Sequence, residues 1–374
     1  MAAIIAGAEE PASPPVAPLR VVTDDYHGTR IDDPYRYFEN QADPEVVRWF
    51  KGQADHAAAV LARIPGRDSL LARLREIDQA TAYRITDIQP RANGDLYYFK
   101  QLADEALPKF YHRSAAGQEA LLIDPARHDG ADEQHASLTY CVPSPDGQHI
   151  AYGIAQGGSE ETTIYVWDVA AGKDLADVID RIETAYTEPQ WLPDGSGFYY
   201  VRRQKLPSGT PPTEIYKRTQ ALFHRLGEDP ERDVLVLAQD SSPDVPLAEA
   251  DFPSLALTPG SRFAIGKIKH GDAADMTLYS ALLSDLGTPR VKWRRICDAS
   301  HKVIDFAVRG DDVYLLTADN APRYKIVRTS LTAPDFAKAE PVVPPGEATI
   351  ASLAVAQEAL YVGLRFAARG EVRR

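Results

Sequence analysis

Hydrophobic positions along this chain recur in six copies of one pattern. Each copy is a short turn rich in Gly, Asp or Pro that is followed at once by an apolar or aromatic run. The turns centre on positions 94, 147, 195, 260, 311 and 358, so successive copies lie 53, 48, 65, 51 and 47 residues apart. A period of about 40–50 residues built from short strands and tight turns is typical of β-propeller blades. The third spacing indicates one insertion.

A second run of alternating polar and apolar residues follows each copy. Such alternation, with β-branched and aromatic residues between turns, is the signal of a β-strand. The sixth of these runs reaches the last residue given, so nothing follows to pair with it. We therefore predict a mainly β chain with about five complete blades and a truncated sixth. The runs span residues 110–113, 164–169, 222–227, 277–282, 325–331 and 371–374.

Helical periodicity precedes the strands. Asp43 is suited to cap a helix with Pro44 at its first position, and the Pro65-Gly66 pair is expected to end it. A second amphipathic helix follows, with an apolar side that includes Leu70 and Leu74. We expect an N-terminal arm and helices over residues 1–80 and a propeller over 81–374. The apolar faces of the two helices require a partner surface that blades do not offer.

The composition narrows the classes of function. The 374 residues are 44% hydrophobic and 25% charged, which is ordinary for a globular protein. A net charge of -13 argues against nucleic acid and anionic membranes as partners, because both attract clustered Lys and Arg. No apolar stretch is long enough to span a bilayer, and the first residues lack the basic region of a signal peptide. We expect a cytoplasmic location, with the periplasm as the alternative.

Motifs for chemistry are missing from the chain. Two distant cysteines, Cys141 and Cys297, and nine scattered histidines give no metal-binding or disulfide pattern. The G-x-S-x-G elbow of an α/β-hydrolase does not occur, and the nearest text, Gly157-Gly158-Ser159, suits a polar turn. We therefore predict no catalytic, cofactor-binding or metal-binding residue and no cofactor.

Other candidate residues have simpler structural explanations. The acidic pairs at 24–25 and 32–33 are expected to form turns or cap helices. Lys269, His270 and Asp272 are expected in a solvated loop of the fourth blade, with a position facing the central channel as the alternative. A set of strand aromatics is expected to pack between adjacent blades, with a stacking ligand site as the alternative: Tyr97, Tyr98, Phe99, Tyr152, Tyr199, Tyr200, Tyr279 and Tyr314.

Three stretches of the sequence resemble the prolyl oligopeptidase family. Residues 33–40, DPYRYFEN, are similar to the family's opening, although Tyr37-Phe38 stands where Trp-Leu is usual. The second stretch includes SPDG at 144–147 and GGSE at 157–160, and the third is WLPDGSGFYY at 191–200. With the text around them, the similarity extends from about residue 21 to 368, although the turn at 258–260 lacks the usual Asp. The combination is specific even though each SPDG alone is weak.

The resemblance implies an enzyme in two parts. It implies that a seven-bladed propeller caps an α/β-hydrolase domain, and that the N-terminal helices belong with the hydrolase. The family's Ser, Asp and His all lie C-terminal to the propeller, so none is carried onto a residue of this chain.

Several functions follow as expectations. The first is the propeller portion of a serine peptidase that cleaves short peptides after proline, with proline-containing peptides and an intramolecular hydrolase domain as partners. This chain would then be inactive alone. A stand-alone binding or scaffold propeller is one alternative. An oligopeptidase for basic residues or an acylaminoacyl peptidase of the same superfamily is another.

Overall fold

The computed structural model describes residues 13–130, 135–289, 291–356 and 358–374. The chain separates into two compact units. The first comprises Met1–Arg84 and Leu102–Glu105, and the second comprises Ile85–Gln101 and Ala106–Arg374. The domain boundary expected between residues 80 and 81 stays a prediction.

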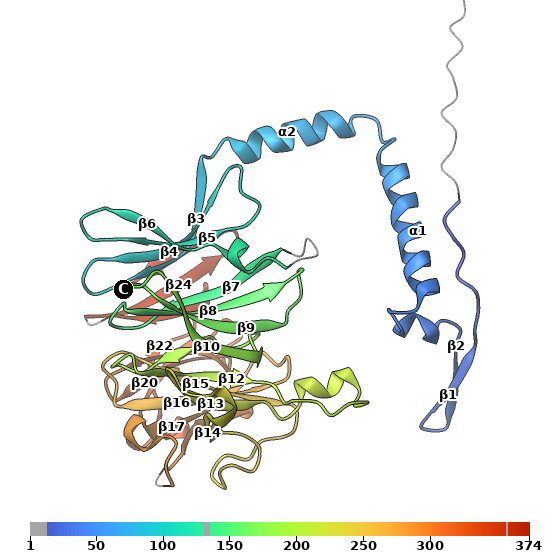
Figure 1. Cartoon of the computed structure of the whole chain (residues 1–374). Coiled ribbons are helices and arrows are strands. Elements are labelled where there is room, and N and C mark those ends of the chain that lie inside the picture. The colour runs from blue at the N-terminus through green and yellow to red at the C-terminus, as the bar shows by residue number, and fades with distance from the viewer. Residues whose placement is uncertain (1–12, 131–134, 290, 357) are drawn as a thin grey trace, which may run out of the picture. The chain divides into compact units, whose positions relative to one another are not determined.

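Successive antiparallel sheets form the second unit (Figure 1). The strands form groups of four consecutive strands, of which the second and third share one eight-stranded sheet, and the last strands described, β23 to β25, form a sheet of three. The first three groups of strands are β3 (Tyr83–Pro90), β4 (Leu96–Leu102), β5 (Lys109–Arg113) and β6 (Glu119–Ile123); β7 (Ala136–Pro143), β8 (His149–Gln156), β9 (Thr162–Asp168) and β10 (Lys173–Ile182); and β11 (Gln190–Trp191), β12 (Gly197–Arg202), β13 (Gln220–Arg225) and β14 (Val234–Leu237).

The remaining strands repeat the arrangement. The second and third groups are joined edge to edge, because Ile182 of β10 pairs with Arg202 of β12. The later strands are β15 (Asp251–Leu257), β16 (Phe263–His270), β17 (Met276–Leu282) and β18 (Arg294–Cys297); β19 (Val303–Arg309), β20 (Asp312–Thr317), β21 (Lys325–Ser330) and β22 (Glu340–Val343); and β23 (Thr349–Val355), β24 (Leu360–Phe366) and β25 (Arg369–Arg373).

The six sequence copies coincide with six blades. Each predicted turn lies between the first and second strands of its blade, and each alternating run supplies the third strand. The predicted fold, a mainly β propeller preceded by a helical segment, is confirmed. Short 3-10 helices occupy several connections: η1 (Arg36–Glu39), η2 (Pro125–His128), η3 (Pro212–Tyr216), η4 (Pro230–Arg232), η5 (Leu283–Asp285), η6 (Ala299–His301) and η7 (Phe336–Lys338).

The hydrophobic core is divided between neighbouring blades. Five clusters of buried side chains each join two consecutive blades, for example Phe110 with Ile150, and Leu278 with Leu315. All eight strand aromatics expected to pack between blades are buried, and seven of them belong to these clusters, Tyr98 being the exception. A blade buries its faces only against its neighbours, which is why the repeat has to occur many times.

The turns of neighbouring blades also touch. A Cβ added at Gly195 would lie 3.0 Å from Asp146 of the preceding blade's turn, and Gly195 has a positive φ of 68°. Between the fourth and fifth blades, Arg262 forms an ion pair with Asp311 at 2.5 Å. The Gly and Asp residues of the repeat therefore serve the turn itself and its contact with the next turn.

A buried charge cluster joins the second and third blades. His224 of β13 is fully buried, with its Nε2 2.9 Å from Asp177 of β10 and its Nδ1 2.9 Å from Asp233. Burial alone would lower the pKa of His224, but the hydrogen bonds to the two carboxylates outweigh burial and raise it to about 9. Tyr200 donates to Asp233 at 2.8 Å, and the Gly227 amide donates to Asp177 at 2.6 Å. The cluster thus links two blades through an imidazolium.

The first unit opens with a β-hairpin that the sequence interpretation missed. Strands β1 (Val22–Tyr26) and β2 (Thr29–Asp33) pair around His27 and Gly28, which both have positive φ. That conformation is the one a two-residue hairpin turn requires. The acidic pairs at 24–25 and 32–33 therefore lie in strands, but two of the four still serve turns as expected, since Asp33 accepts the Tyr35 amide at 2.9 Å. Asp25 likewise accepts the Gly28 amide of the turn, at 2.7 Å.

Two helices follow the hairpin. Helix α1 (Pro44–Leu61) begins as predicted, with the Asp43 carboxylate accepting the Glu45 amide at 2.8 Å. Its first turns are anchored by aromatic contacts of Phe38 with Trp49 and Phe50. Helix α2 (Arg67–Gln79) has no buried residue. Both helices leave large apolar side chains exposed: Val47, Phe50, Leu61, Leu70, Leu74 and Ile77.

Neither a membrane-spanning helix nor a metal-binding cluster is present among the described residues. Neither α1 nor any other helix described has the length and apolar character that a membrane crossing requires. No cluster of three or more His, Cys, Asp or Glu side chains suited to a metal ion occurs among the residues described.

Candidate functional site

One pocket of the second unit is built by loops from three consecutive blades. It lies where the second strands of the blades end and the next strands begin, and its volume is about 680 Å³. We call it the three-blade pocket. A volume of this size is typical of sites that bind small ligands. Its walls include Ser159 and Glu160 from the second blade, Glu183 to Tyr186 from the connection between β10 and β11, Arg203 and Tyr216 from the third blade, and Phe252, Gly271 and Asp272 from the fourth.

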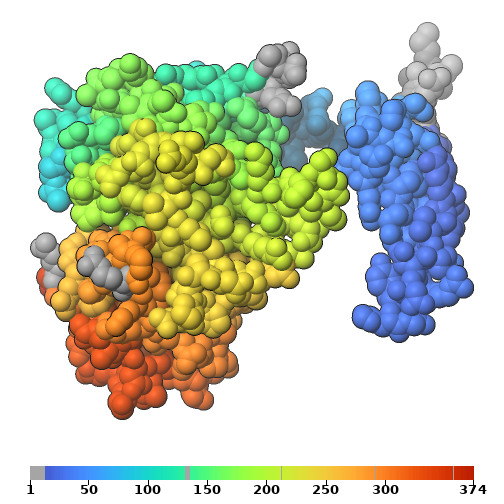
Figure 2. All heavy atoms as spheres, turned by 60° about the horizontal axis from the view of Figure 1, so that its bottom comes forward, coloured from blue at the N-terminus to red at the C-terminus, as the bar shows by residue number. Residues whose placement is uncertain are grey.

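The sequence insertion supplies one wall of this pocket. The long connection between β12 and β13 contains η3 and stands out from the blades (Figures 1 and 2). It brings Tyr216 over the guanidinium of Arg203, with 5.3 Å between the ring centroid and Cζ. The extra residues of the third repeat therefore shape the pocket.

A buried ion pair lies at the pocket. The side chains of Arg203 and Glu183 are both only 5% exposed, and Nε of Arg203 lies 3.2 Å from Glu183 Oε2. This contact lacks hydrogen-bond geometry, because Nε has no acceptor. The other guanidinium contacts are long, at 3.4 Å to the Glu160 carbonyl and 4.0 Å to Glu161. Arg203 thus holds a positive charge with unused donors in a water-poor setting, where hydrogen bonds to a ligand carbonyl are strong.

Aromatic groups form another part of the pocket. Tyr186 packs against Phe252 with 5.1 Å between ring centroids, and its hydroxyl donates to Asp272 at 2.9 Å. Burial and the bond to Asp272 raise the pKa of Tyr186. Lys267 donates to the Tyr186 carbonyl, and burial lowers the pKa of this lysine. The pocket combines apolar rings with a few fixed polar groups, which is the usual chemistry of a binding site.

The structure places the earlier candidate residues as follows. Ser159 and Asp272 line the pocket. Lys269 and His270 lie on strand β16, so the expectation of a solvated loop is wrong for them. Lys269 donates to carbonyls of the turn after β16, including that of Ala274 at 3.1 Å, and His270 bonds Asp251 at 2.8 Å. These two side chains therefore brace a turn.

The central residues of the pocket were missed by sequence reasoning. Glu183 and Arg203 each follow directly after a strand, β10 and β12, but they are twenty positions apart in the chain. Only the pairing of β10 with β12 brings them together. The sequence did contain one signal, the long spacing of 65 residues between the third and fourth turns. It indicated an insertion but not that the insertion forms a wall of the pocket.

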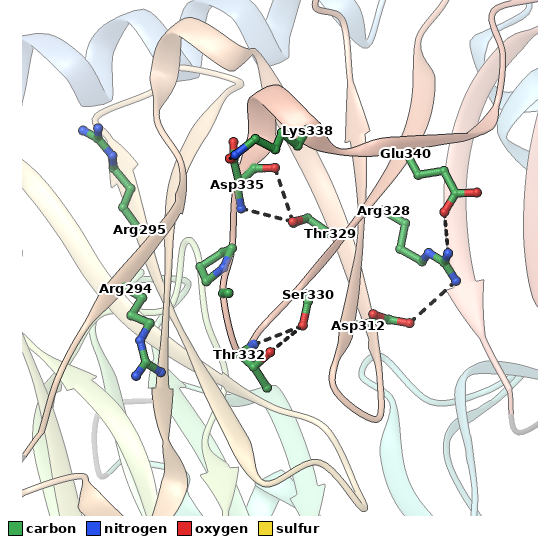
Figure 3. Close-up of a pocket in the computed structure, with 12 residues that line it drawn as sticks. Arg294, Arg295, Asp312, Arg328, Thr329, Ser330, Thr332, Asp335, Lys338 and Glu340 are labelled. Carbon is green, nitrogen blue, oxygen red and sulfur yellow. Dashed lines mark hydrogen bonds and ion pairs between the residues drawn. The ribbon is translucent and has the colours of Figure 1, made fainter.

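A larger hollow lies at the outer strands of the fourth and fifth blades (Figure 3). Its volume is about 860 Å³. Arg328 forms ion pairs with Glu340 and with Asp312, and Lys338 pairs with Asp335 at 2.9 Å. Most of the charges around this hollow already neutralise one another. It is therefore a weaker candidate than the three-blade pocket.

Comparison with known families decides what kind of propeller this is. Residues 14–374 match the family described as prolyl oligopeptidase, N-terminal beta-propeller domain. The chain belongs to this family. The part of the family that it matches is the N-terminal propeller of prolyl oligopeptidases.

Curated relatives agree with the assignment. A prolyl endopeptidase of Elizabethkingia meningoseptica is 26% identical over 315 residues, which cover 83% of this chain and 42% of the relative. Prolyl oligopeptidase ophP of Omphalotus olearius is 25% identical over 335 residues, which cover 83% of this chain and 43% of the relative. The chain therefore spans less than half the length of these two relatives.

Solved structures share the fold. A structure from a study of two prolyl endopeptidases and their inter-domain dynamics matches with a TM-score of 0.82 at 27% identity, over 96% of this chain and 51% of that one. Prolyl oligopeptidase B from Galerina marginata, bound to a 35mer hydrolysis and macrocyclization substrate, matches with a TM-score of 0.77 at 20% identity, over 98% of this chain and 52% of that one. The second likeness shows the fold alone.

Proposed function

We propose that this chain is the substrate-gating propeller of a serine peptidase that hydrolyses short peptides after proline. Family membership supports the peptidase class, and the relatives named prolyl endopeptidase support the specificity. The observation that carries the gating role is the three-blade pocket, with its aromatic rings and buried guanidinium. A peptide chain offers the carbonyl groups and apolar side chains that such a pocket binds.

The chemistry in this proposal is supplied by an α/β-hydrolase domain that lies outside residues 1–374. Its serine attacks the carbonyl after proline, its histidine acts as base and then acid, and its aspartate orients the histidine. The exposed apolar faces of α1 and α2 pack on that domain. The propeller's part is to admit short peptides, exclude folded proteins and hold the peptide through Arg203.

The complete natural polypeptide provides the test of the activity. A fluorogenic substrate with proline before the reporter is compared with its alanine counterpart, and a fluorophosphonate probe is used to label an active serine. We expect cleavage of the proline substrate, slow cleavage of the alanine one, and labelling of the polypeptide outside residues 1–374. If the polypeptide is neither labelled by the probe nor able to cleave the proline substrate, the peptidase proposal is contradicted and a binding propeller is favoured.

The role of the three-blade pocket has a separate test. The double variant Arg203→Gln with Glu183→Gln removes both buried charges together, so no unpaired charge is left behind. Loss of a charged hydrogen bond to the peptide predicts a fall in kcat/KM of about tenfold or more, mainly through KM. The control is Arg218→Gln, whose side chain is 62% exposed and lies outside the pocket's lining. An unchanged KM in a normally folded double variant would refute the role of Arg203.

A further inference from the structure

A second hollow in the propeller lies away from the three-blade pocket, where the first strands of the blades end. Its walls are the ends of β3 and β7, strand β11, and the turn between β15 and β16. Its volume is about 510 Å³. Six of its lining residues are prolines, and we call the hollow the proline groove. These residues are Pro90, Pro143, Pro145, Pro189, Pro193 and Pro259.

The proline groove has an unusual charge balance for so acidic a chain. The chain carries a net charge of -13, yet the residues described as lining the groove include no Asp or Glu. Arg91 is the single charged side chain among them. An apolar groove with one positive charge selects an apolar ligand that carries one negative charge.

The environment of Arg91 leaves its charge without a counterion. Its Nε is buried and has no hydrogen-bond acceptor, and its Nη2 donates to the Pro143 carbonyl at a long 3.3 Å. The guanidinium lies over the ring of Tyr97, 5.3 Å from the centroid. Among the described residues no carboxylate forms an ion pair with it, and burial lowers its pKa. A half-buried cation of this kind is costly until an anion pairs with it.

Other buried arginines of the propeller show the contrast. The side chain of Arg202 is only 7% exposed and is bonded to the carboxylates of Asp180 and Glu231. Arg203 is paired with Glu183. The chain thus supplies an internal carboxylate for these guanidinium groups but not for Arg91, whose position in the groove is open to a ligand.

We propose that the proline groove binds the C-terminal end of a peptide, with the peptide's carboxylate on Arg91 and its apolar last side chains among the prolines. A guanidinium binds a carboxylate through two parallel hydrogen bonds, and the groove's volume suits a short segment. The choice of a peptide as the ligand rests on the proposed function, whereas the groove and its charge do not. The site lies apart from the three-blade pocket, since the two share no lining residue.

Calorimetric titration of the complete polypeptide tests this proposal. The probe is an N-acetylated Phe-Ala-Leu tripeptide, used with a free C-terminal carboxylate and as the C-terminal amide. It contains no proline, so cleavage after proline does not consume it. We expect the free acid to bind about tenfold tighter than the amide or better, because a charge-assisted pair is lost in the amide.

Variants of Arg91 locate the site. Arg91→Gln is expected to bind acid and amide alike, and Arg91→Lys to retain part of the preference for the acid. Arg225→Gln, at an exposed arginine outside the groove, is the control and keeps the full preference. Equal binding of acid and amide to the natural protein, or a preference that survives Arg91→Gln in a variant of normal melting temperature, overturns the proposal.

Two further measurements separate the possible failures. Decanoate, an apolar carboxylate without a peptide backbone, is titrated in parallel, and Arg91-dependent binding as tight as that of the tripeptide would overturn the choice of a peptide. Cleavage after proline is measured on Arg91→Gln and is expected to be unchanged. The titration does not require peptidase activity. If the natural protein does not cleave after proline, binding at the proline groove can still be measured, so the two proposals can fail independently.

Discussion

The buried imidazolium between the second and third blades makes a strong prediction about pH. His224 is fully buried and bonded to two carboxylates, those of Asp177 and Asp233, which are each only 3% exposed. Its pKa is raised from 6.5 to about 9. That difference corresponds to roughly 3 kcal/mol of folding stability.

The sign of the pH effect follows from the raised pKa. The folded protein keeps the proton of His224 up to about pH 9, whereas the unfolded chain releases it near pH 6.5. The contribution is therefore fully present below pH 6.5 and is lost as pH rises through about 9. Removing the imidazole also leaves Asp177 and Asp233 without their shared cation. Breaking a buried pair in this way costs about 3–5 kcal/mol.

Urea unfolding followed by circular dichroism at a series of pH values measures both effects. His224→Ala is expected to lose about 3–5 kcal/mol at pH 6.5, and the deficit is expected to shrink by roughly 3 kcal/mol by pH 9.5. The control is His135→Ala, whose side chain is 77% exposed with a single contact to Asp129, and it is expected to stay within about 0.5 kcal/mol. A deficit in His224→Ala that does not change between pH 6.5 and 9.5 would refute the assignment of a buried imidazolium.

Three further predictions concern packing, capping and thiols. Gly197→Ala places a Cβ 2.3 Å from the His224 carbonyl and is expected to destabilise by about 1–3 kcal/mol, whereas Gly346→Ala, with open space around it, is expected to be neutral in the same thermal melt. Asp43→Ala removes the cap of α1, and hydrogen exchange of the first turn is expected to show a loss of about 1 kcal/mol. Burial raises the pKa values of the Cys141 and Cys297 thiols, so neither is expected to react with Ellman's reagent at pH 8 before urea is added; rapid reaction in the folded protein would contradict this.

Local pattern was enough to predict the repeat. Tight turns are encoded directly by residues such as Gly147 and Gly195, and strands by the alternating runs that follow. Each turn and strand forms from residues of a single blade. The capping of α1 by Asp43 is local in the same sense. The hairpin of β1 and β2 is equally local, with its turn at His27-Gly28. It was missed because the acidic residues on either side were interpreted as turn-forming or helix-capping groups.

The pocket residues depend on distant pairing instead. Glu183 meets Arg203, and Asp177 meets His224, only because the second and third blades join edge to edge. Nothing in the spacing of these residues encodes that contact. The surroundings of Arg91 could not be read from the sequence either. The proline groove is lined by residues of several blades, and only the folded arrangement shows that no carboxylate lies among them.

Selection of substrates by size tests the central claim most directly. One cleavable sequence containing proline is presented to the complete polypeptide twice, as a short peptide and as a surface loop of a stably folded protein. The account predicts rapid cleavage of the short peptide and an intact folded protein over the same period, with both sequences cut once the carrier protein is unfolded and fragmented. Equal rates of cleavage in the short peptide and in the folded loop would contradict the role of this propeller as a gate.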